Sequence, residues 1–228
     1  MGDPGFRRGG GITTVGSGRV PVVPDVAVVR LAAQASDTSA RAAHEAAVEA
    51  AEALLVALRA AGVADRDLRT AATHAWTDPG ATVQEGEQTA TRLPRTTVTI
   101  AVEARLRELV RAGEVIGAAL EAAGDAARLE GTTLQVSDQS AARGQARELA
   151  FADAVAAARQ LAALAGRELG RVIDVRESGS GDVAPVAGRM AMRAAAAVPV
   201  EAGEQEVVVE VVVRHGWADV DDAPRTSG

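Results

Sequence analysis

The chain has 228 residues and a formal net charge of −7, and its residues are 47% hydrophobic but only 2% aromatic. This length allows one large domain or two small ones, while the scarcity of aromatic side chains and the lack of a basic stripe argue against a nucleic-acid partner. The chain has no cysteine and no lysine, which excludes disulfides, thiolate chemistry, Schiff bases and a Walker-type phosphate lysine.

The two ends predict disordered tails. Residues 1–11, MGDPGFRRGGG, are rich in glycine and arginine, and residues 216–228 are acidic and then polar. No apolar segment follows the first arginines, so we expect no signal peptide, and no stretch is long enough for a membrane span. A cytoplasmic protein is therefore expected, with the cell envelope, periplasm or extracellular space as the alternative if the start site is misassigned.

Two strands are predicted next, at residues 12–20 and 26–35, where apolar side chains alternate. Pro21 and Pro24 bracket a break between them, since proline cannot donate to a strand ladder.

Residues 38–61 predict an alanine-rich helix with Asp37 as its N-cap and Gly62 as its left-handed end. Its core stripe at helical spacing consists of His44, Val48, Ala51, Leu55 and Leu58.

The middle of the chain predicts strands around a polar segment. Residues 68–76 predict a strand. Residues 78–94 are turn-rich, which is typical of a long loop or an irregular hairpin. Residues 96–103 alternate cleanly, which places Val98, Ile100 and Val102 inward and Thr97 and Thr99 outward.

Two further helices are predicted, at residues 106–123, closed by Gly124, and at residues 139–165, capped by Asp138 and closed by Gly166. Apolar residues spread around more than one face of the last helix, so it should be well buried or lie at an interface. Strands are predicted around Leu134 and Val136, and at residues 171–177, 188–198 and 206–214.

The sequence thus predicts an α+β fold, an antiparallel sheet with three alanine-rich helices packed against it. A weak repeat relates residues 57–64, ALRAAGVA, to residues 119–126, ALEAAGDA, at two helix ends. Two similar strand-helix-strand halves and a coincidence of alanine-rich helix ends both remain open.

The order of several motifs resembles one family, the SIMPL domain, long catalogued as a domain of unknown function. The resemblance is carried by residues 16–18 (GSG), 24–27 (PDVA), 58–70 (LRAAGVADRDLRT), 113–116 (GEVI), 146–172 and 203–207 (GEQEV). It covers residues 12–215 as one SIMPL-like domain. It implies helices packed on antiparallel sheet, oligomerisation, a loose association with oxidative-stress defence, and no established catalytic residues. Relatives are usually exported to the envelope, and residues 76–96 lack the aromatic residues expected of the family's central loop.

Candidate site residues each have a structural interpretation that we favour. His44, His74 and His215 lie too far apart in sequence for a typical zinc site, and no Gly-x-Ser-x-Gly elbow supports a hydrolase triad. Gly16 and Gly18 indicate a turn or strand bulge more than a phosphate cradle. The remaining candidates are a flexible turn at residues 178–182, the acidic groups Asp65, Asp67, Asp219, Asp221 and Asp222, the pair Met190 and Met192, and Trp76 and Trp217.

We therefore expect a protein that is not an enzyme, with no catalytic, cofactor-binding or metal-binding residues and no cofactor. The leading hypothesis is a homo-oligomeric protein linked to oxidative or general stress defence. The alternative is a small-ligand or metal-binding module with a pocket between residues 77–95 and 179–186, and a third hypothesis is an enzyme of unrecognised type.

Overall fold

The computed structural model describes residues 10–85, 88–178, 183–185 and 203–218. They form helices and antiparallel sheets, as the α+β prediction requires. The described residues divide into two compact units, and residues 24–137 make up the second of them. Residues 10–23 and the described residues from 138 onward make up the first.

The second unit repeats a strand-helix-strand motif. Its first half is β2 (Val26–Asp37), α1 (Ala40–Ala60) and β3 (Leu68–Asp78), and its second half is β6 (Arg95–Leu106), α2 (Leu109–Ala123) and β7 (Ala127–Gln135). Short 3-10 turns, η1 (Asp65–Asp67) and η2 (Gly124–Ala126), precede β3 and β7. The sheet order is β3-β6-β2-β7, which is the ferredoxin-like split βαβ arrangement. Exchanging β2 with β6 and β3 with β7 gives the same strand order read in the opposite direction. Of the two alternatives left open for the similar helix ends, two similar strand-helix-strand halves are therefore the one observed.

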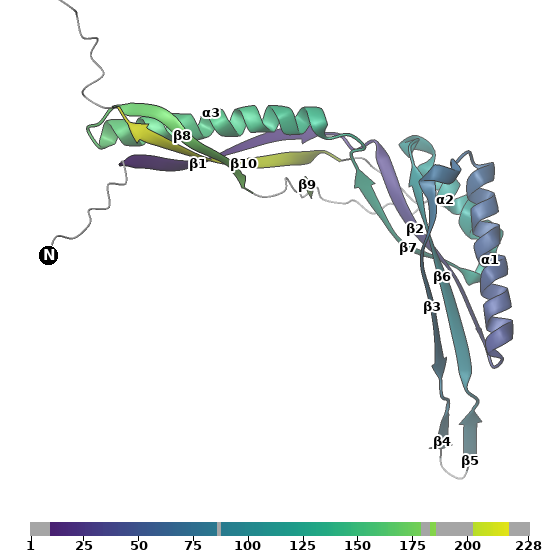
Figure 1. Ribbon diagram of the computed structural model, residues 1–228. Helices are drawn as coiled ribbons and strands as arrows, with labels where there is room; N and C mark the ends of the chain where they lie inside the picture. The colour runs from purple at the N-terminus through teal and green to yellow at the C-terminus, as the bar shows by residue number, and fades with distance from the viewer. Residues whose placement is uncertain (1–9, 86–87, 179–182, 186–202, 219–228) are drawn as a thin grey trace, which may run out of the picture. The chain divides into compact units, whose positions relative to one another are not determined.

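A hairpin of β4 (Ala81–Glu85) and β5 (Gln88–Arg92) lies between β3 and β6 in the chain. It extends beyond those two strands (Figure 1). Of the two alternatives for this polar segment, the hairpin is the one observed.

The core of the second unit lies between the sheet and its two helices, which cover the same face (Figure 1). Fully buried side chains come from every layer: Leu31, Leu54, Leu58, Val102 and Ile116. Val98 and Val102 face inward as predicted. Thr97, predicted to face outward, is buried, and its hydroxyl lies 2.7 Å from the Ser36 hydroxyl on the neighbouring strand, which satisfies its hydrogen bonding there.

The helix starts differ from the predictions for local reasons. Ser39, and not Asp37, caps α1: its hydroxyl accepts from the Ala42 amide, while Asp37 accepts from the Ser39 amide. The buried face of α1 is Ala43, Ala47, Ala50, Ala51, Leu54 and Leu58, so the predicted stripe is partly wrong and His44 is exposed. Helix α2 begins only at Leu109, since Leu106 still belongs to β6 and is buried there.

Left-handed glycines end all three long helices, as predicted. Gly62, Gly124 and Gly166 have φ angles of 92°, 56° and 63°.

The first unit is a sheet in the order β1-β10-β8, with β9 beside β10. Its strands are β1 (Gly11–Val22), β8 (Leu169–Ser178), β9 (Val183–Pro185) and β10 (Gln205–Trp217). Strand β1 pairs with β10 along its whole length, from Gly11 opposite Gly216 to Val22 opposite Gln205. Pro21 therefore continues the strand and does not begin a break; its missing N–H is tolerated because β1 is an edge strand of the described sheet.

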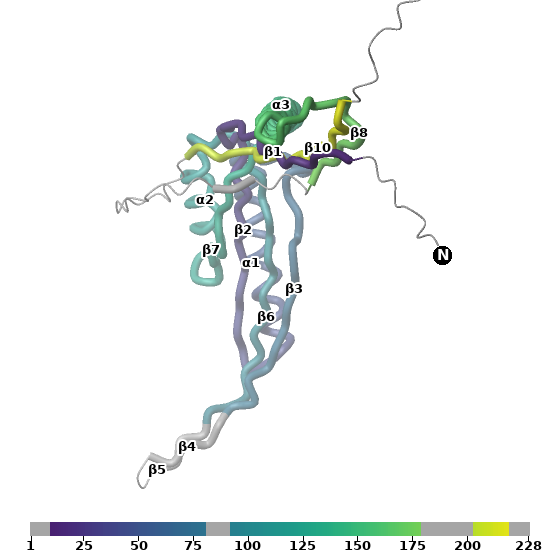
Figure 2. Tube along the Cα trace, turned by 90° about the vertical axis from the view of Figure 1, so that its left-hand side faces the viewer, coloured from purple at the N-terminus to yellow at the C-terminus, as the bar shows by residue number. Residues whose placement is uncertain are grey.

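Helix α3 (Ser140–Leu164) lies along one face of this sheet, over β1 and β10 (Figures 1 and 2). Asp138 accepts from the Ser140 amide at 2.8 Å, but the N-cap position of α3 is Gln139, so the prediction that Asp138 caps this helix is wrong. The helix buries only alanines: Ala146, Ala150, Ala154, Ala158 and Ala162. The larger apolar side chains stay exposed, so of the two predicted alternatives a well buried helix is not observed, while a position at an interface stays a prediction. The strand predicted at residues 188–198 lies outside the described residues.

Candidate functional site

The helix-free face of the second unit's sheet carries a concentration of charge. Adjacent outward positions of β2, β6 and β3 hold Arg30, Glu103 and Arg69, which are directly opposite one another in the register. With the neighbouring positions they line a hollow of about 580 Å³. We call this surface the arginine face and define it by Arg30, Arg66, Asp67, Arg69, Glu103 and Arg105.

Glu103 lies between two arginines from the flanking strands. Arg69 donates to its carboxylate through Nε at 2.9 Å and Nη2 at 2.8 Å, and Arg30 Nη2 lies 3.6 Å away. The hydrogen bonds from Arg69 lower the pKa of Glu103, against the opposing effect of its burial. Glu103 is therefore a carboxylate at neutral pH.

Asp67 is buried at the other end of the arginine face, in η1. Arg107, in the connection between β6 and α2, donates to it through Nε at 3.0 Å and Nη2 at 2.7 Å. Arg66 Nε is farther away, at 3.9 Å. The hydrogen bonds from Arg107 lower the pKa of Asp67, while burial opposes them.

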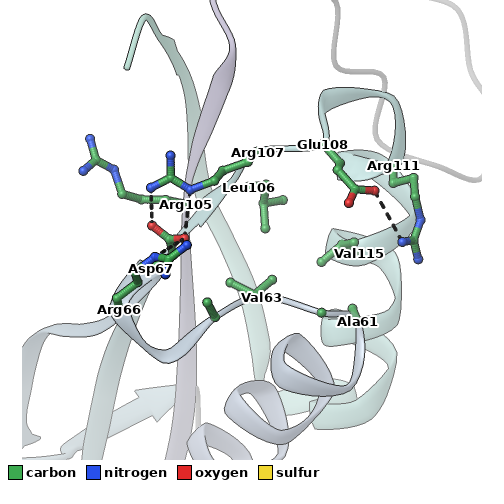
Figure 3. Close-up of a pocket in the computed structure, with 12 residues that line it drawn as sticks. Ala61, Val63, Arg66, Asp67, Arg105, Leu106, Arg107, Glu108, Arg111 and Val115 are labelled. Atoms are coloured by element: carbon green, nitrogen blue, oxygen red, sulfur yellow. Dashed lines mark hydrogen bonds and ion pairs between the residues drawn. The ribbon is translucent and has the colours of Figure 1, made fainter. Parts of the chain in front are cut away.

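Figure 3 shows these groups beside a second, smaller hollow of about 180 Å³. Its wall is partly apolar, with Val63, Leu106 and Val115, and the ion pair of Arg111 with Glu108 lies at the start of α2. Arg66, Asp67 and Arg105 line both hollows, which therefore adjoin.

The lining of the larger hollow is positively charged. Four arginines face two carboxylates, which leaves two positive charges in excess within a chain of net charge −7. Arg105 contributes most directly to this excess, since its one side-chain hydrogen bond among the described residues goes to the neutral Gln135 oxygen at 3.2 Å.

The histidines do not come together with this face. His44 is exposed on α1, His74 is exposed on β3, and His215 is buried on β10, where its Nδ1 has no hydrogen-bond partner in the described part of the chain. Within those same ranges, no three His, Asp or Glu side chains gather as a metal ion would require.

The glycine pair at Gly16 and Gly18 has a packing role. Its predicted turn or bulge is wrong, because both residues lie in unbroken register with β10. A Cβ at either position would lie about 2 Å from a carbonyl oxygen of α3, Ala150 or Ala146. Because these glycines have no side chain, the backbone of α3 can pack directly against β1.

The other candidates separate into described and undescribed residues. Asp65 pairs with Arg59 at 2.7 Å, Trp76 is exposed, and Trp217 lies under the Arg167 guanidinium at 5.1 Å from its ring centre. Residues 179–182, Met190, Met192 and the acidic residues from 219 onward lie outside the described residues. Residues 179–182 and 186, which belong to one wall of the pocket predicted between residues 77–95 and 179–186, are among the undescribed residues.

Sequence reasoning missed the arginine face, although part of its signal was available. The alternation in β2 places Arg30 on the outward side of its strand. The positions of Glu103 and Arg69 beside it depend on strand register, which no local pattern in this chain specifies.

None of the helices in the described part of the chain combines the length and the hydropathy that crossing a bilayer requires. A family model described as "SIMPL: Protein of unknown function (DUF541)" matches residues 12–215, which confirms the predicted resemblance.

Two similar proteins carry the name "26 kDa periplasmic immunogenic protein". The one from Brucella melitensis is 32% identical over 212 residues, and the one from Brucella abortus is 31% identical over 214 residues. Each match covers 89% of this chain and 82% of the relative. Both relatives are named as periplasmic, which contradicts the cytoplasmic location predicted from the N-terminus; that prediction is wrong.

Proposed function

The chain belongs to the SIMPL family, and from this premise we propose that it is a non-enzymatic protein of the cell envelope that associates with copies of itself. Its role in the cell would be protection against oxidative or general stress. Because the chain has no cysteine, this protection does not use a protein thiol.

The observation that carries the proposal is the exposure of large apolar side chains on α3. Leu149, Phe151, Leu161 and Leu164 are 47%, 39%, 46% and 78% exposed, while alanines occupy the buried side. The neighbouring strand β8 exposes Val172, Ile173 and Val175. This many exposed large apolar side chains on one helix and the strand next to it indicate a site of association.

A second copy of this chain is the partner that we assign to this surface. It would bring the same apolar side chains to the contact, as a two-fold symmetric interface requires. Strand β8 also ends one side of the described sheet beside β10, so its outer backbone groups are open to a strand from another copy.

The location follows the relatives, both named as periplasmic proteins. Fractionation of the cells that produce the chain tests it, with recovery in the envelope or periplasmic fraction expected.

Light scattering after size-exclusion chromatography, over a dilution series, tests self-association. We expect a mass well above the 23.2 kDa of one chain. The double change Leu161→Gln and Leu164→Gln removes exposed apolar surface without opening the core, so it should shift the mass toward that of one chain. Val56→Gln, on an exposed position of α1, is the matched control and should leave the mass unchanged. A monomer at every concentration contradicts the proposal.

A further inference from the structure

We propose that the arginine face binds a phosphate-bearing ligand, with Arg30, Arg66 and Arg105 as its principal donors. The site is separate from the apolar surface of α3 and does not depend on self-association.

The two carboxylates of the arginine face hold guanidinium groups in place. Glu103 is 12% exposed and takes two hydrogen bonds from Arg69, with Arg30 beside it at 3.6 Å. A largely buried carboxylate that receives a bidentate hydrogen bond fixes Arg69 in place, so this part of the arginine face is ordered before a ligand arrives.

The anchors use few of the available donors. A guanidinium has five N–H groups. Asp67 already accepts two hydrogen bonds from Arg107. The Arg66 guanidinium lies 3.9 Å from the Asp67 carboxylate, and its side chain is 79% exposed. Arg105 donates to the neutral Gln135. Arg30, Arg66 and Arg105 therefore retain N–H groups for an acceptor from outside the chain.

The excess charge selects the class of ligand. The excess of positive charge in this hollow suits a phosphate group, which carries about one negative charge as a diester and close to two as a monoester at neutral pH. The planar guanidinium fork also fits phosphate oxygens in pairs. The volume of about 580 Å³ accommodates a phosphate together with a small organic group.

A phosphate group reaches such a face either on a small soluble ester or as the headgroup of a lipid. The chemistry of recognition is the same in both cases, so the measurement has separate arms for the two sources.

Phosphorus NMR titrations of the full-length protein with inorganic phosphate and with glycerol 3-phosphate test the soluble source. Co-sedimentation with phosphatidylglycerol vesicles, compared with phosphatidylcholine vesicles, tests the lipid source. The variants are Arg30→Gln and Arg105→Gln, both at exposed side chains. Arg41→Gln is the matched control, since Arg41 is 86% exposed on α1 and pairs only with Glu45 among the described residues.

We expect saturable binding in at least one arm, weakened about tenfold or more by each site variant and unchanged by Arg41→Gln. Binding of the soluble phosphates assigns a soluble ester, and binding of phosphatidylglycerol vesicles alone assigns a headgroup. The proposal is overturned if no arm shows binding, or if Arg41→Gln weakens binding as much as the site variants do. Unfolding midpoints of the variants, measured in parallel, separate lost binding from lost structure.

Discussion

Single residues decide how closely α3 approaches its sheet. Thr14, Gly16 and Gly18 occupy successive inward positions of β1, and the Thr14 hydroxyl donates to the Ala154 carbonyl at 2.8 Å. Any side chain at Gly16 or Gly18 would meet the helix backbone, which cannot move aside as a flexible side chain can. The alanines on the facing side of α3 complete this close contact, and together they explain why the larger side chains of the helix point elsewhere.

Gly18→Ala should destabilise the first unit by about 1–3 kcal/mol, because the new Cβ would lie 1.9 Å from the Ala146 oxygen and force the helix away. Gly144→Ala is the matched control within α3: its Cβ meets nothing within 4 Å, so this change should stabilise the helix by roughly 0.5–1 kcal/mol. Urea unfolding of both variants in a Trp76→Phe background reports on the first unit through Trp217. Equal midpoints for the two variants would contradict the packing role of Gly18.

At the scale of elements, the sequence predicts most of the described helices and strands, but not which side chains of neighbouring elements they contact. Glycine positions predicted where α1, α2 and α3 end, since only glycine adopts positive φ readily. Apolar alternation at residues 96–103 likewise predicted β6, and the valine-rich run at residues 206–214 predicted β10. The predicted stripe of α1 is right at Ala51 and Leu58 but wrong at His44, because in a helix this rich in alanine several faces look equally apolar. The Arg30, Glu103 and Arg69 arrangement required the strand register, which is a property of the assembled sheet.

The ion pair of Asp67 with Arg107 joins two elements, η1 and the connection between β6 and α2. Hydrogen bonds from Arg107 lower the pKa of Asp67 in the folded chain below the unfolded value of about 3.9. The pair therefore contributes its full stabilisation at pH values above the unfolded pKa. That contribution is lost as pH falls through the lower, folded pKa.

Asp67→Asn should lower the free energy of unfolding at pH 7 by about 1–3 kcal/mol, since Asp67 is buried but Arg107 is half-exposed. The variant should also lose less stability than the parent protein between pH 7 and pH 3. Urea midpoints at both pH values, read from Trp76 in a Trp217→Phe background, measure this. Asp65→Asn, at an exposed ion pair in the same turn, should behave like the parent. An identical pH dependence in the Asp67 variant would rule out the assigned role.

At the scale of the whole molecule, the two units differ in whether their residues are continuous in the sequence. The second unit is continuous over residues 24–137, and its main core cluster lies entirely within that range. The first unit needs both ends of the described chain, because β1 pairs with β10 over twelve residues at a separation of nearly two hundred positions. The first unit therefore requires both of these distant strands, and closing the long connection between them adds to the entropic cost of folding.

A fragment of residues 24–137 should consequently fold alone and unfold cooperatively in urea, as followed by Trp76 fluorescence and circular dichroism. Leu54→Ala supplies the control for a native core: Leu54 is fully buried, and its truncation should cost roughly 2–5 kcal/mol. If the fragment has the same core as the full chain, this loss is the same in both. A fragment without a cooperative transition, or with a markedly smaller loss at Leu54, would show that the second unit requires the rest of the chain.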